Sequence, residues 1–233
     1  GLAQTHDNNG NLVDEGTNLY DYDFADRLRK VTQKTDGAVF AVYTYDATGR
    51  RISKVITNSD TLNGTTRFYL DGWRVIEEQD GKENIIQQYV YGNYIDEFLV
   101  KDWNMNGDNT AIGPGDERLF YHQNSLYSVL GLTDITGKLI EGYQYDAYGK
   151  QTIIIPGPNG VIDFGGDDVL LQEGRSSYNN HYLYTGRELD AESKLYYFRN
   201  DYLSSTHGRF ISRDPLGFWH DAVNHGNPMA YVG

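Results

Sequence analysis

The chain has no cysteine, only 5 prolines in 233 residues, and no apolar run as long as a membrane-spanning helix needs. The lack of cysteine excludes disulfides, cysteine-ligated metals and cysteine nucleophiles. The lack of a long apolar run argues against a transmembrane helix, which needs about 20 apolar residues. No signal peptide is recognisable and the chain starts at Gly1 without methionine, so we expect a processed piece or fragment of a longer protein.

Basic residues are also few. Lys and Arg number 20 against 33 Asp and Glu, which gives a formal net charge of −13. Proteins that bind nucleic acids or anionic membranes present basic patches, so this balance argues against both kinds of partner. The excess of acidic residues indicates solubility.

Glycine and tyrosine are abundant, with 26 and 20 residues respectively, while the hydrophobic fraction is 39%. This composition favours many short strands and turns around a sheet that keeps one face in water. We therefore predict an all-β fold of antiparallel hairpins with little helix. Only Leu189–Phe198 and Val223–Tyr231 suggest a helical turn or two.

A tyrosine-rich pattern recurs along the chain. It reads Tyr-x-Tyr-Asp-x-x-Gly-Arg, complete at residues 43–50, nearly complete at 143–150 and degraded at 20–27. Shorter echoes begin at Tyr69, Tyr89, Tyr182 and Tyr196. A repeat with this period indicates one supersecondary unit used many times.

The repeat reads as a β-hairpin. Tyr43 and Tyr45 are two residues apart and therefore point to one sheet face, where each hydroxyl could stay in water. Asp46 and Gly49 occupy the first and last places of a four-residue turn, in which the carboxylate accepts a backbone N–H and glycine takes a positive φ. Residues 51–57 alternate in part and form the return strand.

Two stretches interrupt the repeats. Residues 101–117 are rich in Asn, Asp and Gly, and residues 153–178 contain Pro-Gly and Gly-Gly pairs. Insertions on a repeat scaffold fall on loops, which often contact partners. We expect a wall of repeats over residues 1–120 with the first insertion, and a second part over 121–233 with the other.

Three segments of the second part resemble the Rhs/YD-repeat family of large bacterial proteins, and in particular its Rhs-associated core. They are residues 121–137, residues 184–199, and residues 208–217, which are close to the motif GRFxSxDPxG. The first segment departs from the family pattern at Asn124, where Asp is common, and at Tyr127, where Gly is common. The first 40 residues match less well.

The resemblance implies a continuous β-sheet that spirals into a hollow shell, closed at one end by the core. In toxin relatives such a shell encloses a variable C-terminal polypeptide, and in several the core is an aspartyl autoprotease that releases it. Relatives continue beyond the point that matches Gly233 into a second Asp-Pro-x-Gly. The spacing over residues 218–227 is more similar to large Rhs-type surface proteins.

The first candidate site is Asp214 with Arg213. Aspartyl proteolysis needs two carboxylates that share a proton, and Asp214 could supply one while Arg213 keeps it ionised or orients the scissile carbonyl. The second carboxylate lies in the continuation or elsewhere, Asp221 being a weak local candidate. The competing interpretation is a strand followed by an Asp-Pro-x-Gly turn without chemistry.

The second candidate site is a Ca²⁺ loop formed by Asp102, Asn104, Asn106 and Asp108. Oxygen ligands at alternate positions with glycine sixth match the first half of such a loop. Position twelve is Gly113 rather than glutamate, so Asp116 or Glu117 would have to substitute. The competing interpretation is a solvated turn. No other cofactor is expected.

Other chemistry finds little support. The six histidines lack the spacing of a metal site, and no Gly-x-Ser-x-Gly or phosphate-binding loop occurs. The surplus of tyrosine and tryptophan would suit stacking on sugar rings, although packing in the sheet wall or core is the favoured explanation.

We therefore predict a non-catalytic shell or scaffold segment of a larger secreted or cell-surface bacterial protein, which encloses or displays a C-terminal polypeptide. Its partners would be further repeats of the parent chain or copies of itself, joined through open sheet edges. The alternatives are a single-turnover autoproteolytic aspartyl core and an adhesin that binds glycans or depends on Ca²⁺.

Overall fold

The computed structural model describes residues 4–213, 229 and 231. By their contacts the residues form two compact units, each described by itself below. The first unit comprises Gly1–Thr66 and Asp190–Gly233, and the second comprises Arg67–Leu189.

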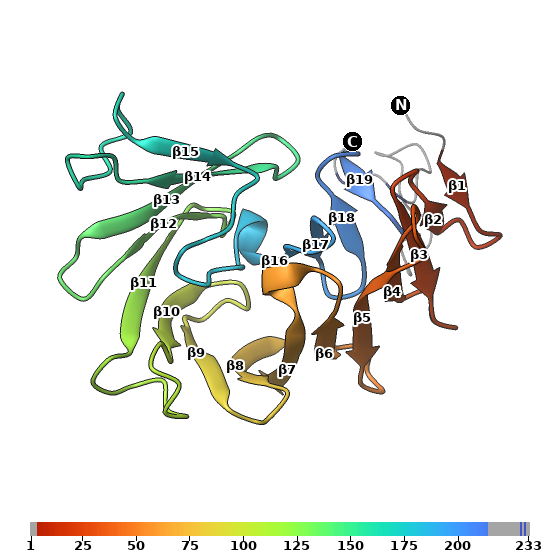
Figure 1. Cartoon of the computed structure of the whole chain (residues 1–233), viewed down its shortest axis with the longest axis horizontal. Coiled ribbons are helices and arrows are strands. Elements are labelled where there is room, and N and C mark those ends of the chain that lie inside the picture. The colour runs from red at the N-terminus through yellow and green to blue at the C-terminus, as the bar shows by residue number, and fades with distance from the viewer. Residues whose placement is uncertain (1–3, 214–228, 230, 232–233) are drawn as a thin grey trace. The chain divides into compact units, whose positions relative to one another are not determined.

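The first unit contains an antiparallel run of strands and a small C-terminal sheet (Figure 1). The strands of the run are β1 (Thr5–His6), β2 (Leu12–Asp14), β3 (Asn18–Tyr22), β4 (Leu28–Gln33), β5 (Val39–Tyr45) and β6 (Arg51–Ile56). The C-terminal strands are β17 (Leu195–Tyr197), β18 (Tyr202–Ser204) and β19 (Arg209–Phe210), paired in this order. A short 3₁₀ turn, η1 (Asp60–Leu62), follows β6.

The second unit is an antiparallel run in which each strand pairs with the next in sequence. Its strands are β8 (Arg74–Asp80), β9 (Ile85–Tyr91), β10 (Phe98–Trp103), β11 (Glu117–Gln123), β12 (Val129–Thr133), β13 (Leu139–Tyr145), β14 (Gln151–Ile155) and β15 (Val169–Gln172). β7 (Gly64–Asp71) and β16 (Glu188–Asp190) cross the boundaries between the units. A second 3₁₀ turn, η2 (Tyr184–Gly186), precedes β16.

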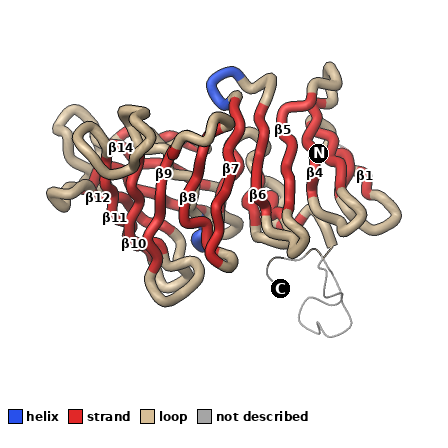
Figure 2. Tube along the Cα trace, turned by 90° about the horizontal axis from the view of Figure 1, so that it is seen from below, coloured by secondary structure: helices blue, strands red, loops and turns tan. Residues whose placement is uncertain are grey.

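The predicted fold class is confirmed. Strands connected by short turns dominate both units (Figure 2), and helix among the described residues is confined to η1 and η2. None of the described helical segments has the length and apolar character needed to cross a membrane.

Two segments singled out in the sequence can be located in the structure. At Leu189–Phe198 the expected helical turn is limited to one turn between β16 and β17, in which the N–H groups of Ser193 and Lys194 donate to the Asp190 carbonyl at 3.2 and 2.8 Å. Residue 120, where the sequence suggested a division, lies inside β11 and is paired with Val100 and Thr133 of the neighbouring strands. Val223–Tyr231 lies almost wholly outside the described residues.

The turn geometry expected for the repeat is found. In the 46–50 turn the Asp46 N–H donates to the Arg50 carbonyl at 2.9 Å, and the Gly49 N–H donates to the Asp46 carbonyl at 3.1 Å. Asp46 Oδ1 accepts the N–H groups of Thr48 and Arg50, and Gly49 has φ +89°. Among the described residues this backbone pattern occurs in turns 7–11, 23–27, 46–50, 80–84, 124–128, 134–138 and 146–150.

The hydroxyl of the second tyrosine of the repeat bonds to the protein backbone, whereas the sequence suggested that it could stay in water. The Tyr45 hydroxyl donates to the Leu28 carbonyl at 2.6 Å, and the Tyr145 hydroxyl to the Val129 carbonyl at 2.7 Å. Tyr22 and Tyr91 make equivalent bonds to Leu12 and Val75. Each reaches a carbonyl on an earlier strand, so the tyrosine ties successive hairpins together in addition to packing.

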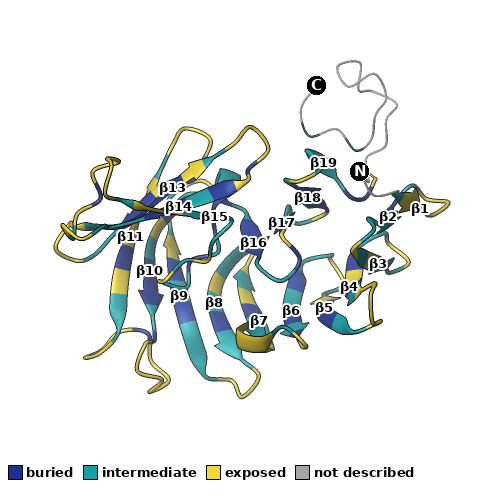
Figure 3. Cartoon of the chain, turned by 45° about the horizontal axis from the view of Figure 1, so that its top comes forward, coloured by how far each residue is buried: buried dark blue, intermediate teal, exposed yellow. Residues whose placement is uncertain are grey.

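Alternating burial places one face of the strands inside (Figure 3). In the second unit Tyr89, Lys101 and Leu119 are cross-strand partners and all are buried. The core cluster of the first unit joins both of its sheets and consists of Leu12, Tyr20, Leu28, Val31, Phe40, Ala41, Tyr43, Leu195, Tyr202 and Ile211.

Candidate functional site

Of the proposed protease residues, the structure describes only Arg213. Asp214 and Asp221 lie outside the described residues. Arg213 is exposed and borders a cavity of about 250 Å³ in the first unit, which is lined also by Met229 and by the 7–10 turn. The Phe210 N–H donates to the Met229 carbonyl at 3.0 Å and so fixes Met229 beside β19.

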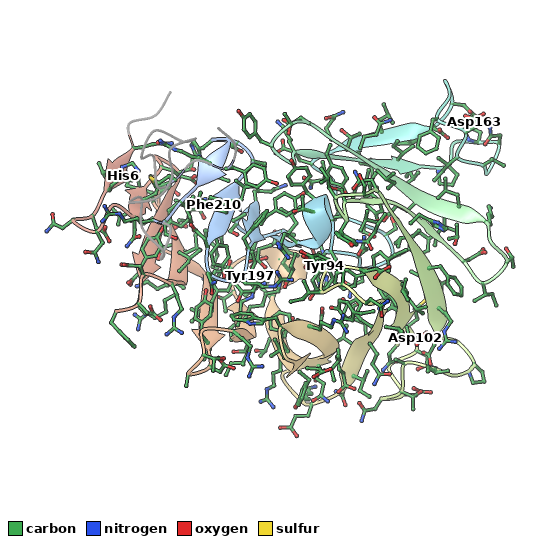
Figure 4. The ribbon with its side chains drawn as sticks, turned by 180° about the vertical axis from the view of Figure 1, so that it is seen from behind. His6, Tyr94, Asp102, Asp163, Tyr197 and Phe210 are labelled. Carbon is green, nitrogen blue, oxygen red and sulfur yellow. The ribbon has the colours of Figure 1, made fainter. Side chains whose placement is uncertain are left out.

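The proposed Ca²⁺ ligand Asp102 is already neutralised. Its Oδ1 accepts the Arg118 Nε at 2.6 Å and its Oδ2 accepts Nη2 at 2.9 Å, across paired residues of β10 and β11. Asp102 is buried and belongs to the strand rather than to the loop (Figure 4).

The other three predicted ligands shape the loop between β10 and β11. Asn104 Oδ1 accepts the Gly107 N–H at 2.7 Å, and Asn106 Oδ1 accepts the Asp108 N–H at 2.8 Å. Asp108 Oδ1 accepts both the N–H and the hydroxyl of Thr110. Of the four predicted residues, Asp102 thus pairs with Arg118, whereas the other three make hydrogen bonds within the loop.

A different acidic group occurs in the insertion between β14 and β15. Carboxylate oxygens of Asp163, Asp167 and Asp168 lie within 4.8 Å of one another. Asp163 and Asp167 are exposed, and exposed acidic groups often occur without a metal. Figure 4 shows Asp163 well apart from Asp102, so the two loops are separate features.

The most deeply buried ion pair lies in the first unit. Asp190, at the end of β16, accepts both terminal nitrogens of Arg51 from β6 and the Lys54 ammonium at 3.1 Å. Asp190 has no exposed surface and Arg51 is 2% exposed. Two cations therefore neutralise one carboxylate inside the protein.

Tyrosines surround the Arg51 guanidinium. It lies over the rings of Tyr197, Tyr43 and Tyr202 at 4.2, 5.1 and 5.9 Å from the centroids. Cation–π contact is strong when the cation is desolvated. The Tyr43 hydroxyl continues the network to Glu192 at 3.1 Å, and burial raises the pKa of that carboxyl.

The second unit also buries carboxylates. Glu78 on β8 accepts hydrogen bonds from Gln87 and Tyr89 and pairs with His181 at 2.7 Å. Burial opposes ionisation of Glu78, but the charge of His181 and these hydrogen bonds outweigh it and lower the pKa to about 2. Glu78 is thus an ionised carboxylate in the interior.

Glu141 on β13 is a further buried carboxylate, and it accepts the Ser177 N–H at 3.0 Å and the hydroxyls of Ser176 and Tyr143. Burial raises its pKa in spite of these donors. Burial lowers the pKa of Lys101 to about 7, with Glu78 and Glu141 acting in the opposite direction. The Lys101 ammonium donates to the Tyr178 carbonyl.

Glu78, Lys101 and Glu141 all contact one segment, residues 174–187, which we call the strap. Besides the contacts of Ser176, Ser177, Tyr178 and His181, the strap uses Asn180, whose amide bonds the hydroxyls of Tyr121 and Tyr143 at 2.8 and 3.0 Å. The Val129 N–H donates to the strap carbonyl of Leu183 at 3.1 Å. The inner face of the second unit is therefore covered through polar contacts with β8, β10, β11, β12 and β13.

The strap ends in a strained turn. Thr185 and Gly186 have φ values of +49° and +67°, and Arg187 pairs with the buried Asp96. A Cβ at Gly186 would lie 2.8 Å from the Asp96 Cβ and 3.0 Å from its carbonyl oxygen, so only glycine fits. This geometry explains the Thr-Gly-Arg-Glu part of the sequence motif.

Two tyrosines stack at the end of the second unit that lies away from the β10–β11 loop. Because consecutive strands are antiparallel, the β9–β10 and β11–β12 loops lie at one end of the second unit. There Tyr94, 50% exposed, stacks on Tyr127 with centroids 4.6 Å apart and an interplanar angle of 16°. The pair places aromatic rings at the surface of the second unit.

Sequence reasoning missed the buried groups. These groups are charged side chains at inward positions: Glu78, Lys101, Glu141 and Asp190. In the sequence they interrupt the alternation of apolar residues, and this interruption was the signal that could have revealed them. These buried networks join segments that are distant in sequence.

No protein-family model matches the chain. The chain is 32% identical over 214 residues to the tRNA nuclease WapA of Bacillus subtilis, covering 91% of this chain and 8% of that protein. It is 28% identical to the double-stranded DNA deaminase toxin A of Burkholderia cenocepacia, covering 93% of this chain and 15% of that one.

Among solved structures, the chain is similar to the crystal structure of TcdB2-TccC3, with a TM-score of 0.64 and 19% identity over 92% of this chain and 10% of that one. This likeness shows the fold alone. It confirms the architecture expected from the sequence, since the chain shares the β-sheet arrangement of a toxin component. The chain spans less than a fifth of each of these proteins.

Proposed function

We propose that the chain is a wall segment of a larger, secreted or surface-displayed bacterial toxin-type protein, and that the wall encloses or displays a C-terminal polypeptide. The observation that carries this proposal is the run of short antiparallel strands, paired in sequence order, in a fold shared with TcdB2-TccC3. A sheet of this kind leaves edges for further strands.

The interior supports a structural role. The strap and the Asp190 network use buried polar groups to hold segments that are distant in sequence. The named relatives are a tRNA nuclease and a DNA deaminase toxin. We infer that such activities belong to other parts of a parent protein, so the negative charge of this chain does not exclude a nucleic-acid target for the parent.

The test is protection of the C-terminal polypeptide. We expect the parent gene product to keep its C-terminal part resistant to added protease under native conditions, and to lose that resistance in the variant Asp190→Asn, which opens the first unit. Equal digestion of the C-terminal part in the intact parent and as an isolated polypeptide would contradict enclosure.

Autoproteolysis is the enzymatic alternative, in which Asp214 and Arg213 cut the parent chain once. It is favoured by the cavity beside Arg213. Intact-mass analysis of the parent as wild type and as Asp214→Asn decides it. A cut present in wild type and absent in the variant supports the alternative, and an uncut chain in both leaves a passive wall.

An adhesin is the remaining alternative, and the stacked Tyr94–Tyr127 pair is the observation in its favour. A glycan array probed with wild type and with Tyr94→Ala, each with and without EDTA, tests it. Binding that disappears in the variant would support a sugar site, and the absence of any signal would exclude it.

A further inference from the structure

Asp116 is half-buried, and its carboxylate stands out among those of the described residues. Both of its carboxylate oxygens are buried and accept no hydrogen bond. Elsewhere in residues 4–213, Asp168 and Glu192 each have only one such oxygen. No lysine, arginine or histidine in the described part of the chain forms an ion pair with Asp116.

An unpaired carboxylate is costly to remove from water, and buried carboxylates are normally paired or bound to a metal. A buried group without a partner therefore needs an explanation, and an ion is among the ordinary ones. Here the surrounding chain is acidic, with a net charge of −13, which favours a cation.

The carboxylate points into the loop between β10 and β11. A Cβ built at Gly113 would lie 3.3 Å from Asp116 Oδ2 and 3.6 Å from Thr110 Oγ1, so these oxygens converge beside Gly113. The Thr110 hydroxyl also reaches Asp108, to whose Oδ1 it donates at 2.7 Å. The Thr110 hydroxyl is thus bonded to Asp108 and lies beside the same glycine as the Asp116 carboxylate.

We propose that this loop binds Ca²⁺, with Asp116 as its central ligand and Asp108 and Thr110 beside it. The donors are all oxygens, which selects a hard cation, and an irregular loop suits Ca²⁺ better than the strict octahedron that Mg²⁺ requires. The site goes beyond the wall function and does not depend on it.

This ligand set differs from the one expected from the sequence. Asp102 is used by Arg118, and the side-chain oxygens of Asn104 and Asn106 accept backbone N–H groups of the loop. Asp108 is retained from the expected set. Asp116, which the sequence offered only as a substitute, becomes the principal residue.

Calcium titration by calorimetry, on the chain freed of divalent cations, tests the proposal. We expect one Ca²⁺ per chain with a Kd of about 10⁻⁴ M, in the range of extracellular modules. Asp116→Asn, which keeps the shape of the side chain, should weaken binding at least ~10-fold because it removes the charge that Ca²⁺ requires. Asp163→Asn is the matched control and should leave binding unchanged.

Two outcomes overturn the proposal: no heat with wild type, and heat that is lost in Asp163→Asn but kept in Asp116→Asn. The latter would assign the ion to the acidic group of the β14–β15 insertion.

Terbium luminescence supplies a second readout that does not depend on Asp116→Asn folding. Trp103 is the cross-strand partner of Glu117, directly beside Asp116, so it should sensitise Tb³⁺ bound in the loop. Trp103→Phe should remove most of this emission while leaving the calcium heat unchanged. Full emission from Trp103→Phe would place the ion elsewhere and overturn the proposal.

Discussion

In the first unit two cations, Arg51 and Lys54, neutralise the buried carboxylate of Asp190. In the second unit Glu141 is buried among hydroxyl and N–H donors, and the nearby Lys101 donates a hydrogen bond to the Tyr178 carbonyl instead. The first arrangement cancels charge by pairing, whereas the second relies on hydrogen bonds from the strap. The two units should therefore respond differently to loss of a charged group.

The largest effect is expected from Asp190→Asn. Removing one partner of a buried ion pair leaves uncompensated charge, and two cations would remain here, so the free energy of unfolding should fall by about 3–5 kcal/mol. Urea denaturation at neutral pH measures it. Asp21→Asn is the control, since the Asp21–Lys30 pair is exposed and should contribute less than ~1 kcal/mol. Equal effects of the two variants would contradict the distinction.

Lys101→Met should act in the opposite direction. Replacing a buried ammonium by an apolar side chain of similar length should stabilise the protein at pH 6 by about 1–2 kcal/mol, after the loss of the hydrogen bond to the Tyr178 carbonyl. Thermal denaturation of both proteins measures the difference. A clear loss of stability would show that the ammonium is needed by the strap.

Lys101→Met should also change how the free energy of unfolding depends on pH. The folded pKa of Lys101 is about 7 against an ordinary 10.5, so between these values the unfolded chain binds more protons. Wild-type stability should therefore rise with pH across this window, and the advantage of Lys101→Met should shrink from pH 6 to pH 9. A difference between the two proteins that does not change with pH would contradict the lowered pKa.

A smaller effect is expected where the strap turns at Gly186. Alanine there meets Asp96 at 2.8 Å in addition to taking a positive φ, so Gly186→Ala should cost about 2 kcal/mol. Gly160 also has a positive φ, of +73°, but a Cβ there meets nothing within 4 Å. Gly160→Ala should therefore cost about 1 kcal/mol. Denaturation curves of both variants isolate the contact with Asp96.

The smallest effect is expected at the repeat turn. Asp46→Asn keeps an oxygen that accepts the turn N–H groups and loses only the ion pair with Arg50, so the cost should be about 0.5 kcal/mol. Asn124 shows that asparagine suits this place, since its Oδ1 accepts the Leu126 and Ser128 N–H groups. A loss above ~2 kcal/mol for Asp46→Asn would mean that the charge is essential to the turn.

Local chemistry made the fold predictable. The Asp46–Gly49 pattern contains all the groups that its turn needs, and alternation over β5 places Tyr43 and Tyr45 on one face. Even Tyr127, where the resembling family commonly has glycine, adopts the positive φ of +63° that the turn requires. Short-range patterns therefore specified the hairpins.

The candidate sites depended on long-range contacts and were less predictable. Asp102 is neutralised by Arg118, which faces it only because of the register between β10 and β11. Asp190 and Arg51 are 139 residues apart in sequence. Neither partnership follows from the spacing of residue types, because it arises from which strands lie together.

The pairing of strands in sequence order also has a kinetic consequence. Within each run a strand finds its partner across one turn, so most backbone contacts are local, and proteins dominated by local contacts fold quickly. The hairpins can form one after another as the polypeptide emerges, without waiting for its end. Asp190 and the strap arrive after the strands that they fasten. The wall thus assembles in the direction in which the chain is synthesised. The strap and Asp190 are added last and complete the packing of strands that have already formed.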